Sequence, residues 1–564
     1  MSINPLFEAI KAHDIDNITQ MLTGYHENIS LEAQDDDGNT AALLAARSGQ
    51  IDTLRLLVSS RANINHVNKN GETPLISALL NDQTAVVHFL IEARAQLETR
   101  DRNGNTALNV AALKGNLDAL KSLMSANAST NVLSSNLRSP LMLAALNGHT
   151  AIVQLFIDAG KTLEVRDING DTAVCLASFN GHSETLKTLI AAKAAIDVVN
   201  DGGQDPLLLA TWHGRTAAAG VLLDSGISRE TRNRSGNSAV SIAAFKGHTE
   251  LLKLLINAKA AVDVVDILSQ SPLWLAASHG HIAAVNVLLD CNVPLEVRNN
   301  KGLTAVSVAS MNGHTGVLTR LLEAKAAVDI TDQLGRSPLL WAAANGHDDV
   351  IDVLIAAGAQ LEAKDLSGTT TLGVAAAEGR TPILKDLAAV NASLTPGENA
   401  VQHPLLLAAS NGHVSTVDKL LALGCSVETR NPNNDTAVSL AAAGGYGLVI
   451  ERLIAAKASV DVLNDQHKSP LYLAVCSGHD DAVAKLIALG ANVNIEAGGL
   501  TALAVAVMHG FPDIVDNLLS AKADVVGETA HGQTLLMLAA RQGQDANVRK
   551  VISAFISEMA VNGD

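Results

Sequence analysis

The sequence predicts an all-α solenoid, in which short pairs of antiparallel helices stack one behind another. One 33-residue skeleton recurs along most of the 564-residue chain, and a fixed period of this length is typical of repeat architectures. Aromatic residues make up only 2% of the composition, which suits thin layers of alanine, leucine and valine better than one large core. Within each copy, apolar residues three and four apart indicate two helices, and a polar segment rich in turn residues follows them.

The stretch 271–300, SPLWLAASHGHIAAVNVLLDCNVPLEVRNN, shows the skeleton of one copy. Ser or Thr comes first, then P/A-L/V, then A-A or A-S, then G-H, then L-L or L-I, and finally G/K-A-x-V/L-D/E. Of the fifteen steps between successive copies, only that from Ser469 to Thr501 is 32 residues and not 33. The sixteen copies begin at Thr40, Thr73, Thr106, Ser139, Thr172, Asp205, Ser238, Ser271, Thr304, Ser337, Thr370, His403, Thr436, Ser469, Thr501 and Thr534.

This pattern resembles the ankyrin repeat. The resemblance implies an all-α ankyrin-repeat solenoid of paired antiparallel helices with β-hairpin-like arms. Residues 1–34 would form an N-terminal capping repeat, residues 35–533 the array, and residues 534–564 a C-terminal capping repeat. The sequence departs from the family pattern T-P-L-H, because no copy has histidine at the fourth position. The family is one of non-enzymatic scaffolds and adaptors, so the resemblance implies a partner protein without identifying it.

The local chemistry of each copy predicts where its helices begin and end. Ser or Thr is expected to cap the first helix, and proline, as at Pro206, fits the first turn, where its missing N–H costs nothing. Glycine of the Gly-His pair fits a left-handed helix end, and the histidine is expected to form hydrogen bonds in this turn. Asp/Asn-x-x-Gly stretches such as 167–170 predict the turn at the tip of each arm. The stretch 366–402 is irregular, and the sequence does not say whether the array hinges there.

A second period of 66 residues lies over the first. The residue after P/A-L/V alternates between large and small, as in Met142, Cys175, Leu208 and Ser241. We interpret this as volume sharing between neighbouring helices, because protein interiors pack near crystal density. The end of the second helix alternates between glycine and lysine over the same period. Such regular columns serve a function or are traces of recent duplication, and the sequence leaves both open.

Charge and composition exclude several classes of partner. The net charge of −17 argues against nucleic acid and against anionic membranes. No apolar run reaches the length of a membrane span, and the N-terminus resembles neither a signal peptide nor a transit peptide. The four cysteines are scattered, which predicts an intracellular, cytoplasmic protein. We predict no enzyme, no cofactor and no metal, since His279-x-His281 alone does not make a metal site and no catalytic motif occurs.

One column, two residues before the Gly-His pair, is large and apolar in the N-terminal half and small after Met311. In the resemblance this position faces the concave groove of the array, and polar residues such as His213 and Lys246 flank it. An apolar seam with a polar rim is typical of a partner-binding site; alternatively, these side chains complete the core. The column members predicted to bind a partner are Leu80, Leu113, Leu146, Phe179, Trp212, Phe245 and Met311, and the apolar arm tips Ile168, Ile267, Leu268, Leu334 and Leu366 extend the site.

We predict a scaffold or adaptor that binds another protein on its concave face, through an extended segment, a helix or a folded surface. It would be a monomer or one subunit of a hetero-complex. The alternative is a structural subunit of a large assembly that docks through repeated charged edges. Those edges are columns of Glu and Arg in the arms, such as Glu230 and Arg232, in which each arginine is expected to lie near carboxylates of its own and a neighbouring arm.

Overall fold

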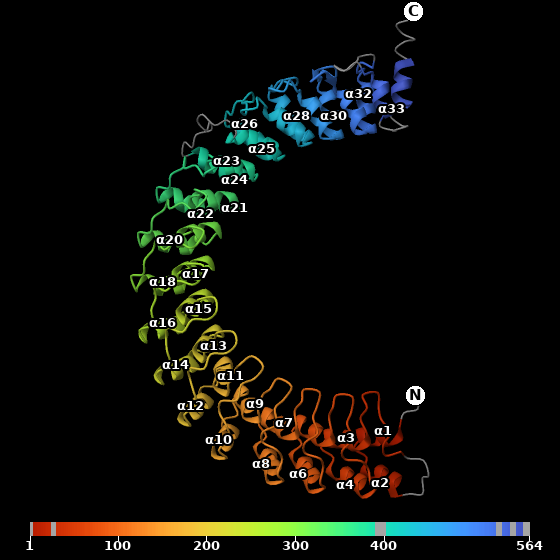
Figure 1. Ribbon diagram of the computed structural model, residues 1–564, viewed down its shortest axis with the longest axis vertical. Helices are drawn as coiled ribbons and strands as arrows, with labels where there is room; N and C mark the ends of the chain where they lie inside the picture. Colours follow the sequence, from red (N-terminus) through yellow and green to blue (C-terminus); the bar gives the residue numbers. More distant parts are fainter. Residues whose placement is uncertain (1–3, 24–29, 390–401, 526–532, 542–548, 557–564) are drawn as a thin grey trace, which may run out of the picture. The chain divides into compact units, whose positions relative to one another are not determined.

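The computed structural model describes residues 4–23, 30–389, 402–525, 533–541 and 549–556. The chain divides into two compact units, here called the N-terminal unit (residues 1–276 and 283–293) and the C-terminal unit (residues 277–282 and 294–564). Each unit is a row of antiparallel helix pairs joined by loops (Figure 1). The predicted all-α solenoid of paired helices is therefore confirmed.

Where a repeat is described in full, it contributes two short helices followed by a polar arm. The first helices are α1 (Pro5–Lys11), α3 (Ala41–Arg47), α5 (Pro74–Leu80), α7 (Ala107–Lys114), α9 (Pro140–Leu146), α11 (Ala173–Asn180), α13 (Pro206–Trp212), α15 (Ala239–Lys246), α17 (Pro272–Ser278), α19 (Ala305–Met311), α21 (Pro338–Asn345), α23 (Thr371–Ala377), α25 (Pro404–Ser410), α27 (Ala437–Ala443), α29 (Pro470–Cys476), α31 (Ala502–His509) and α33 (Leu535–Arg541). The second helices are α2 (Ile15–Thr23), α4 (Ile51–Ser59), α6 (Thr84–Glu92), α8 (Leu117–Ser125), α10 (Thr150–Asp158), α12 (Ser183–Ala191), α14 (Thr216–Asp224), α16 (Thr249–Asn257), α18 (Ile282–Leu289), α20 (Thr315–Glu323), α22 (Asp348–Ala356), α24 (Thr381–Ala389), α26 (Val414–Ala422), α28 (Gly447–Ala455), α30 (Asp480–Ala488) and α32 (Pro512–Ser520). Residues 549–556 are also helical. A short strand pair, β1 (Glu496–Ala497) and β2 (Leu500–Thr501), lies in one arm.

The first helices begin where the predicted caps stand. The hydroxyl of Thr73 accepts the N–H of Ile76 at 3.2 Å, and the carboxylate of Asp205 accepts that of Leu208 at 2.8 Å. Each satisfies a backbone donor that the helix itself leaves without a partner. Thr40 and Thr106 depart from the prediction, since neither side chain caps its helix.

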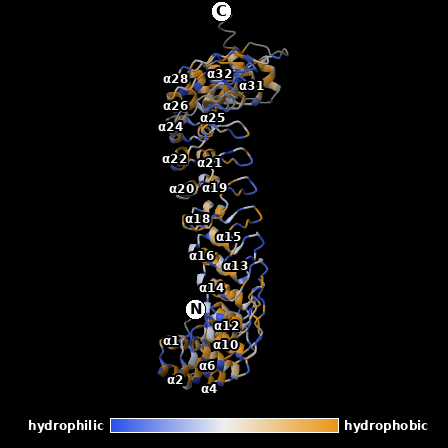
Figure 2. Cartoon of the chain, turned by 90° about the vertical axis from the view of Figure 1, so that its left-hand side faces the viewer, coloured by the Kyte–Doolittle hydropathy of each residue, from blue (hydrophilic) through white to orange (hydrophobic). Residues whose placement is uncertain are grey.

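Within each unit, a helix packs on its partner in the repeat and on the equivalent helices of the neighbouring repeats. In the N-terminal unit α11 contacts α9, α12 and α13, while α12 contacts α10 and α14. Helix α11 buries nearly its whole length, including Val174, Cys175 and Ala177, because it has neighbours on several sides. Figure 2 shows the hydrophobic residues concentrated on the helices and many hydrophilic residues in the arms.

Both members of the large and small column are buried. Met142 and Leu208 are at most 1% exposed, and Cys175 and Ser241 are fully buried. Some small members of the column are polar. The Ser241 hydroxyl lies 3.2 Å from the hydroxyl of Ser238, which caps the same helix. Ser241 is thus packed in the interior and contacts the residue that caps its own helix.

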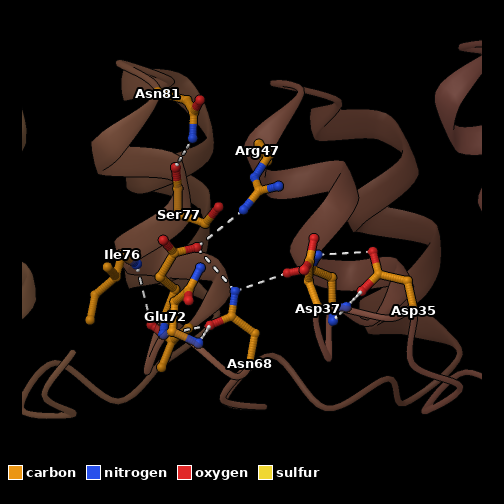
Figure 3. A network of polar contacts seen from close by, with 11 residues as sticks. Asp35, Asp37, Arg47, Asn68, Glu72, Ile76, Ser77 and Asn81 are labelled. Carbon is orange, nitrogen blue, oxygen red and sulfur yellow. Dashed lines mark hydrogen bonds and ion pairs between the residues drawn. The ribbon is translucent and has the colours of Figure 1, made fainter. Parts of the chain in front are cut away.

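The arms are built from a repeated turn. Its first residue is Asp or Asn, whose side-chain oxygen accepts the backbone N–H groups two and four residues on. Asp35 receives them from Asp37 and Asn39 at 3.0 and 2.8 Å, as Figure 3 shows. Neighbouring arms are joined by side chains, since the Asn68 amide donates to Asn39 at 2.9 Å and to Glu72 at 3.1 Å. The predicted turn chemistry is thus confirmed, and the turns bind one another.

The charged columns of the arms bind the backbone of the following arm. Glu230 accepts the backbone N–H of Ala261 in the next arm at 3.0 Å, and Arg232 donates to the carbonyl of Val265 at 3.1 Å. The same bonds recur 66 residues earlier, from Ala195 to Glu164 and from Arg166 to Val199. These arm side chains thus satisfy N–H and C=O groups that the backbone of an extended arm leaves unpaired, and the bonds join neighbouring arms.

Histidines of the Gly-His turns bind the preceding repeat. The Nε2 atom of His149 lies 3.0 Å from the carbonyl oxygen of Leu113, and that of His182 lies 3.0 Å from that of Leu146. The imidazole ring also lies against the glycine of the preceding turn, and a Cβ on Gly148 would come 2.4 Å from the His182 ring. Glycine is needed there both for its left-handed backbone and for the close approach of the ring.

A substitution at Ser307 tests whether large and small side chains of neighbouring repeats share volume. Its side chain is fully buried, with its hydroxyl 3.1 Å from that of Thr304, so we expect Ser307→Trp to overpack the site and to destabilise the repeat by about 1–3 kcal/mol. Met537 occupies the same column but is 60% exposed, and Met537→Trp is the control that leaves stability unchanged. Hydrogen exchange of α19 and α33 measures both effects. Unchanged protection of α19 in Ser307→Trp would contradict the volume-sharing interpretation.

Substitutions at the ends of the second helices test whether the left-handed lysines there strain the backbone. Gly226 (φ +85°) and Lys259 (φ +65°) are both left-handed, and a Cβ on Gly226 would meet nothing within 4 Å. Gly226→Ala should therefore lower local stability by about 1–2 kcal/mol through backbone strain alone. Lys259→Gly relieves that strain and should be neutral or stabilising in hydrogen exchange of α16. Destabilisation by Lys259→Gly would show that the lysine side chain itself is required.

Candidate functional site

In the N-terminal unit the predicted apolar column lies at the C-terminal ends of the first helices and is partly exposed. Phe179, near the end of α11, is 39% exposed, and Trp212, the last residue of α13, is 37% exposed. Leu80, Leu113, Leu146 and Phe245 are half-buried. The column therefore both packs on neighbouring helix ends and presents apolar surface, which combines the two interpretations of the sequence.

Three aromatic side chains of this column fall into two neighbouring ring pairs. The Phe179 ring lies 4.0 Å from the imidazole of His213, between ring centres, in a tilted arrangement. The Trp212 and Phe245 rings are stacked with their centres 6.1 Å apart. The ammonium group of Lys246 lies 4.2 Å from the centre of the Trp212 ring, and this cation–π contact desolvates only part of its charge.

A pocket of about 340 Å³ opens beside the second ring pair. It lies entirely within the N-terminal unit, between helices α13, α15 and α17 and the arms that precede α15 and α17. Its lining combines residues that the sequence nominated separately, from the apolar column and from the arm tips. The pocket is lined by Trp212, Asn233, Ser235, Asn237, Ile242, Phe245, Asp266, Ile267, Leu268, Gln270 and Leu275.

The arm tips explain how two distant parts of the sequence meet. Ile267 is 70% exposed and Leu268 44% exposed, and the N–H of Ile267 donates to the carbonyl of Ser235 in the preceding arm at 3.2 Å. Ile168 is bound to its neighbouring arm in the same way and is 53% exposed, but it does not line the pocket. Of the predicted residues, the pocket therefore joins Trp212 and Phe245 with Ile267 and Leu268.

The predicted residues of the C-terminal unit form a separate group. Met311 is half-buried at the end of α19, whereas Leu334 and Leu366 are exposed by 54% and 77% on neighbouring tips. The N–H of Leu366 donates to the carbonyl of Leu334 at 2.9 Å. Sequence reasoning missed Trp341, which stands in another column; the Arg336 guanidinium carbon lies 3.9 Å from the centre of its ring.

The electrostatic surroundings of the ring pairs are cationic. Burial lowers the pKa of His213 below its usual value, and the nearby charges of Arg215, Lys246 and His248 lower the pKa further. Arg215 donates its Nε–H to the carbonyl of Phe179 at 3.2 Å. Arginine stands here where many other repeats have the Gly-His histidine, and this substitution was the signal that sequence reasoning left unused.

The described residues contain no group of three or more His, Cys, Asp or Glu residues able to hold a metal ion. Burial raises the pKa of the Cys175 and Cys425 thiols to about 11, which keeps both thiols protonated at neutral pH. None of the helices in the described part of the chain has both the length and the apolar character needed to span a bilayer.

The pKa of His213 tests the geometry of the first ring pair. Nuclear magnetic resonance titration of the ring should give a pKa below 6.5 in the native chain. Phe179→Ala should raise this pKa, because burial is the larger cause, and Lys246→Met should raise it less, because it removes one nearby positive charge. Lys253→Met, on α16, is the control. A pKa unchanged by Phe179→Ala would contradict the packing of the two rings.

The sequence profile described as ankyrin repeats (3 copies) matches this chain in overlapping segments that cover residues 6–396 and 405–497. The matched segments include every helix from α2 to α24 and from α26 to α30. The chain has no significant match among curated proteins.

Proposed function

We infer the function of this chain from its family: the chain belongs to the ankyrin-repeat family, and ankyrin repeats are generally protein–protein interaction modules. Members are typically non-enzymatic. We propose that this chain is a non-enzymatic scaffold or adaptor, and that it binds one partner protein on the concave face of the array. The partner would contact the apolar column of the N-terminal unit, with Phe179, Trp212 and Phe245 at the centre.

The observation that carries this proposal is the partly exposed aromatic cluster beside a pocket. The whole chain has only 13 aromatic residues (Trp 3, Tyr 3, Phe 7), yet three of them lie in consecutive repeats of one column. Aromatic side chains beside a pocket supply large contact area at low entropic cost and are enriched among the residues that dominate binding energy. The polar side chains around the cluster match the rim expected of such a site.

The alternative, a subunit of a large assembly that docks through charged edges, draws less support from the arms. Their carboxylates and guanidinium groups, as in Glu230 and Arg232, already bind the backbone of the next arm. A group that is engaged within its own chain must break a bond to dock elsewhere. We place the protein in a reducing, cytoplasmic compartment, which is supported by its four free cysteines.

Replacing Phe179, Trp212 and Phe245 by Ser removes most of the exposed apolar surface of the cluster. We expect affinity for the captured partner to fall by about 30-fold or more. Affinity purification from the native source, read by mass spectrometry, identifies the partner, and titration with the purified partner measures the loss.

The matched control replaces Ala344, Ala377 and Ala443 by Ser, in the same column of the C-terminal unit. It should leave both partner capture and helical content unchanged. Helical content by circular dichroism must also stay unchanged in the aromatic triple variant, so that lost binding is not lost folding. A partner retained in full by the folded triple variant would refute the site.

A further inference from the structure

The pocket beside Trp212 and Phe245 has an apolar interior, and the ammonium group of Lys246 lies over the Trp212 ring that forms part of its wall. Ile242, Leu275, Ile267 and Leu268 supply aliphatic walls, and the two aromatic rings close one side. A volume of about 340 Å³ is large enough for one bulky side chain and too small for a folded element. The apolar part of a ligand for this pocket is therefore a single anchoring residue.

Two cationic side chains lie beside the aromatic cluster, Lys246 at the Trp212 ring and Arg215 at the carbonyl of Phe179. Among the described residues, neither Lys246 nor Arg215 forms an ion pair; Lys246 lies over the Trp212 and Phe245 rings, and Arg215 donates to a carbonyl. Lys114, which occupies the position of Lys246 four repeats earlier, is paired with Asp82 at 3.3 Å. The two charges beside the aromatic cluster are thus left available, in a chain whose net charge is −17.

Neighbouring groups reinforce this positive charge. The charges that act on His213 come from Arg215, Lys246 and His248, all of which lower its pKa. Asp266 is the only acidic residue among those that line the pocket, and its Oδ1 accepts the N–H groups of Leu268 and Gln270 at 2.9 and 2.8 Å. This carboxylate is engaged in forming the arm and leaves the local balance positive.

We propose that this part of the N-terminal unit binds an acidic segment of a partner protein, which inserts one large apolar side chain into the pocket and places carboxylates against Lys246 and Arg215. The inference rests on the proposed scaffold function and names the chemistry of its partner. Carboxylates are chosen because they complement two unpaired cations, and a linear segment because the pocket admits only one side chain.

The chain itself supplies substitutions that remove charge and keep the fold. Lys246→Met retains an apolar stem over the Trp212 ring. Arg215→His restores the residue that other repeats have at this position, where it binds the same type of carbonyl, as His149 and His182 do. The control pair is Lys253→Met, an exposed lysine of α16, with Arg380→His, which occupies the Arg215 position in the C-terminal unit.

The probe is a display library of random 12-residue peptides, selected on the full chain, with the recovered sequences then synthesised. We expect peptides with one large apolar residue flanked by Asp or Glu. Their affinity should fall about tenfold or more in Lys246→Met with Arg215→His and stay unchanged in the control pair. It should also fall between about 50 and 500 mM salt, because exposed charges are screened.

Three results would overturn the proposal: recovery of neutral or basic peptides, an empty selection, or acidic peptides that bind the charge-reduced chain equally well. A 12-nucleotide oligothymidylate is the competing probe. If it binds the native chain and not the charge-reduced chain, the site binds nucleic acid instead.

Capture of the purified native partner separates the scaffold proposal from the acidic-segment proposal. Capture lost in the aromatic triple variant but unchanged in the charge-reduced chain would leave the scaffold function intact and refute the acidic segment, whereas capture retained by the triple variant would refute the scaffold site itself.

Discussion

Each repeat of this protein completes hydrogen bonds that its neighbour cannot complete alone. A histidine ring binds the carbonyl that ends the first helix of the preceding repeat, as His182 binds Leu146. A carboxylate of one arm binds the N–H of the next arm, as Glu164 binds Ala195. An isolated repeat would leave these buried or extended backbone groups without partners, and such groups are costly to leave unsatisfied. The constant 33-residue step is the condition under which all these bonds form at once.

This constraint separates residues that hold the array from residues free to bind something else. Arm carboxylates, arm arginines and turn histidines bind backbone groups of a neighbouring repeat. The arm tips and the C-terminal ends of the first helices keep more of their apolar surface exposed, as Ile267 and Trp212 show. It is there that Trp212 and Ile267 line one pocket. Exposed apolar residues at positions that packing does not dictate are better candidates for binding than charges that the backbone already uses.

The sequence predicted a large part of this arrangement from columns. The capping residues, the turn chemistry, the left-handed lysines such as Lys259 (φ +65°) and the turn histidines all follow from local rules applied at a fixed spacing. The arm charges could not be assigned in the same way. A column of Glu beside a column of Arg indicates ion pairs, yet the partners of Glu230 and Arg232 are backbone groups. Backbone donors and acceptors are invisible in a sequence, since every residue except proline carries both.

The sequence by itself determined the family, the helix pairs and the identity of the apolar column, because these depend on periodic spacing and on residue type. Only the tertiary structure decided that Ile267 and Leu268 line the same pocket as Trp212 and Phe245, more than twenty residues away, while Ile168 does not. It also decided that, within the described part of the chain, Lys246 forms no ion pair whereas Lys114 pairs with Asp82. Which residues line the pocket and which lysine is paired depend on the spacing between neighbouring arms. The stacking of whole repeats sets this spacing, and no single copy of the pattern contains it.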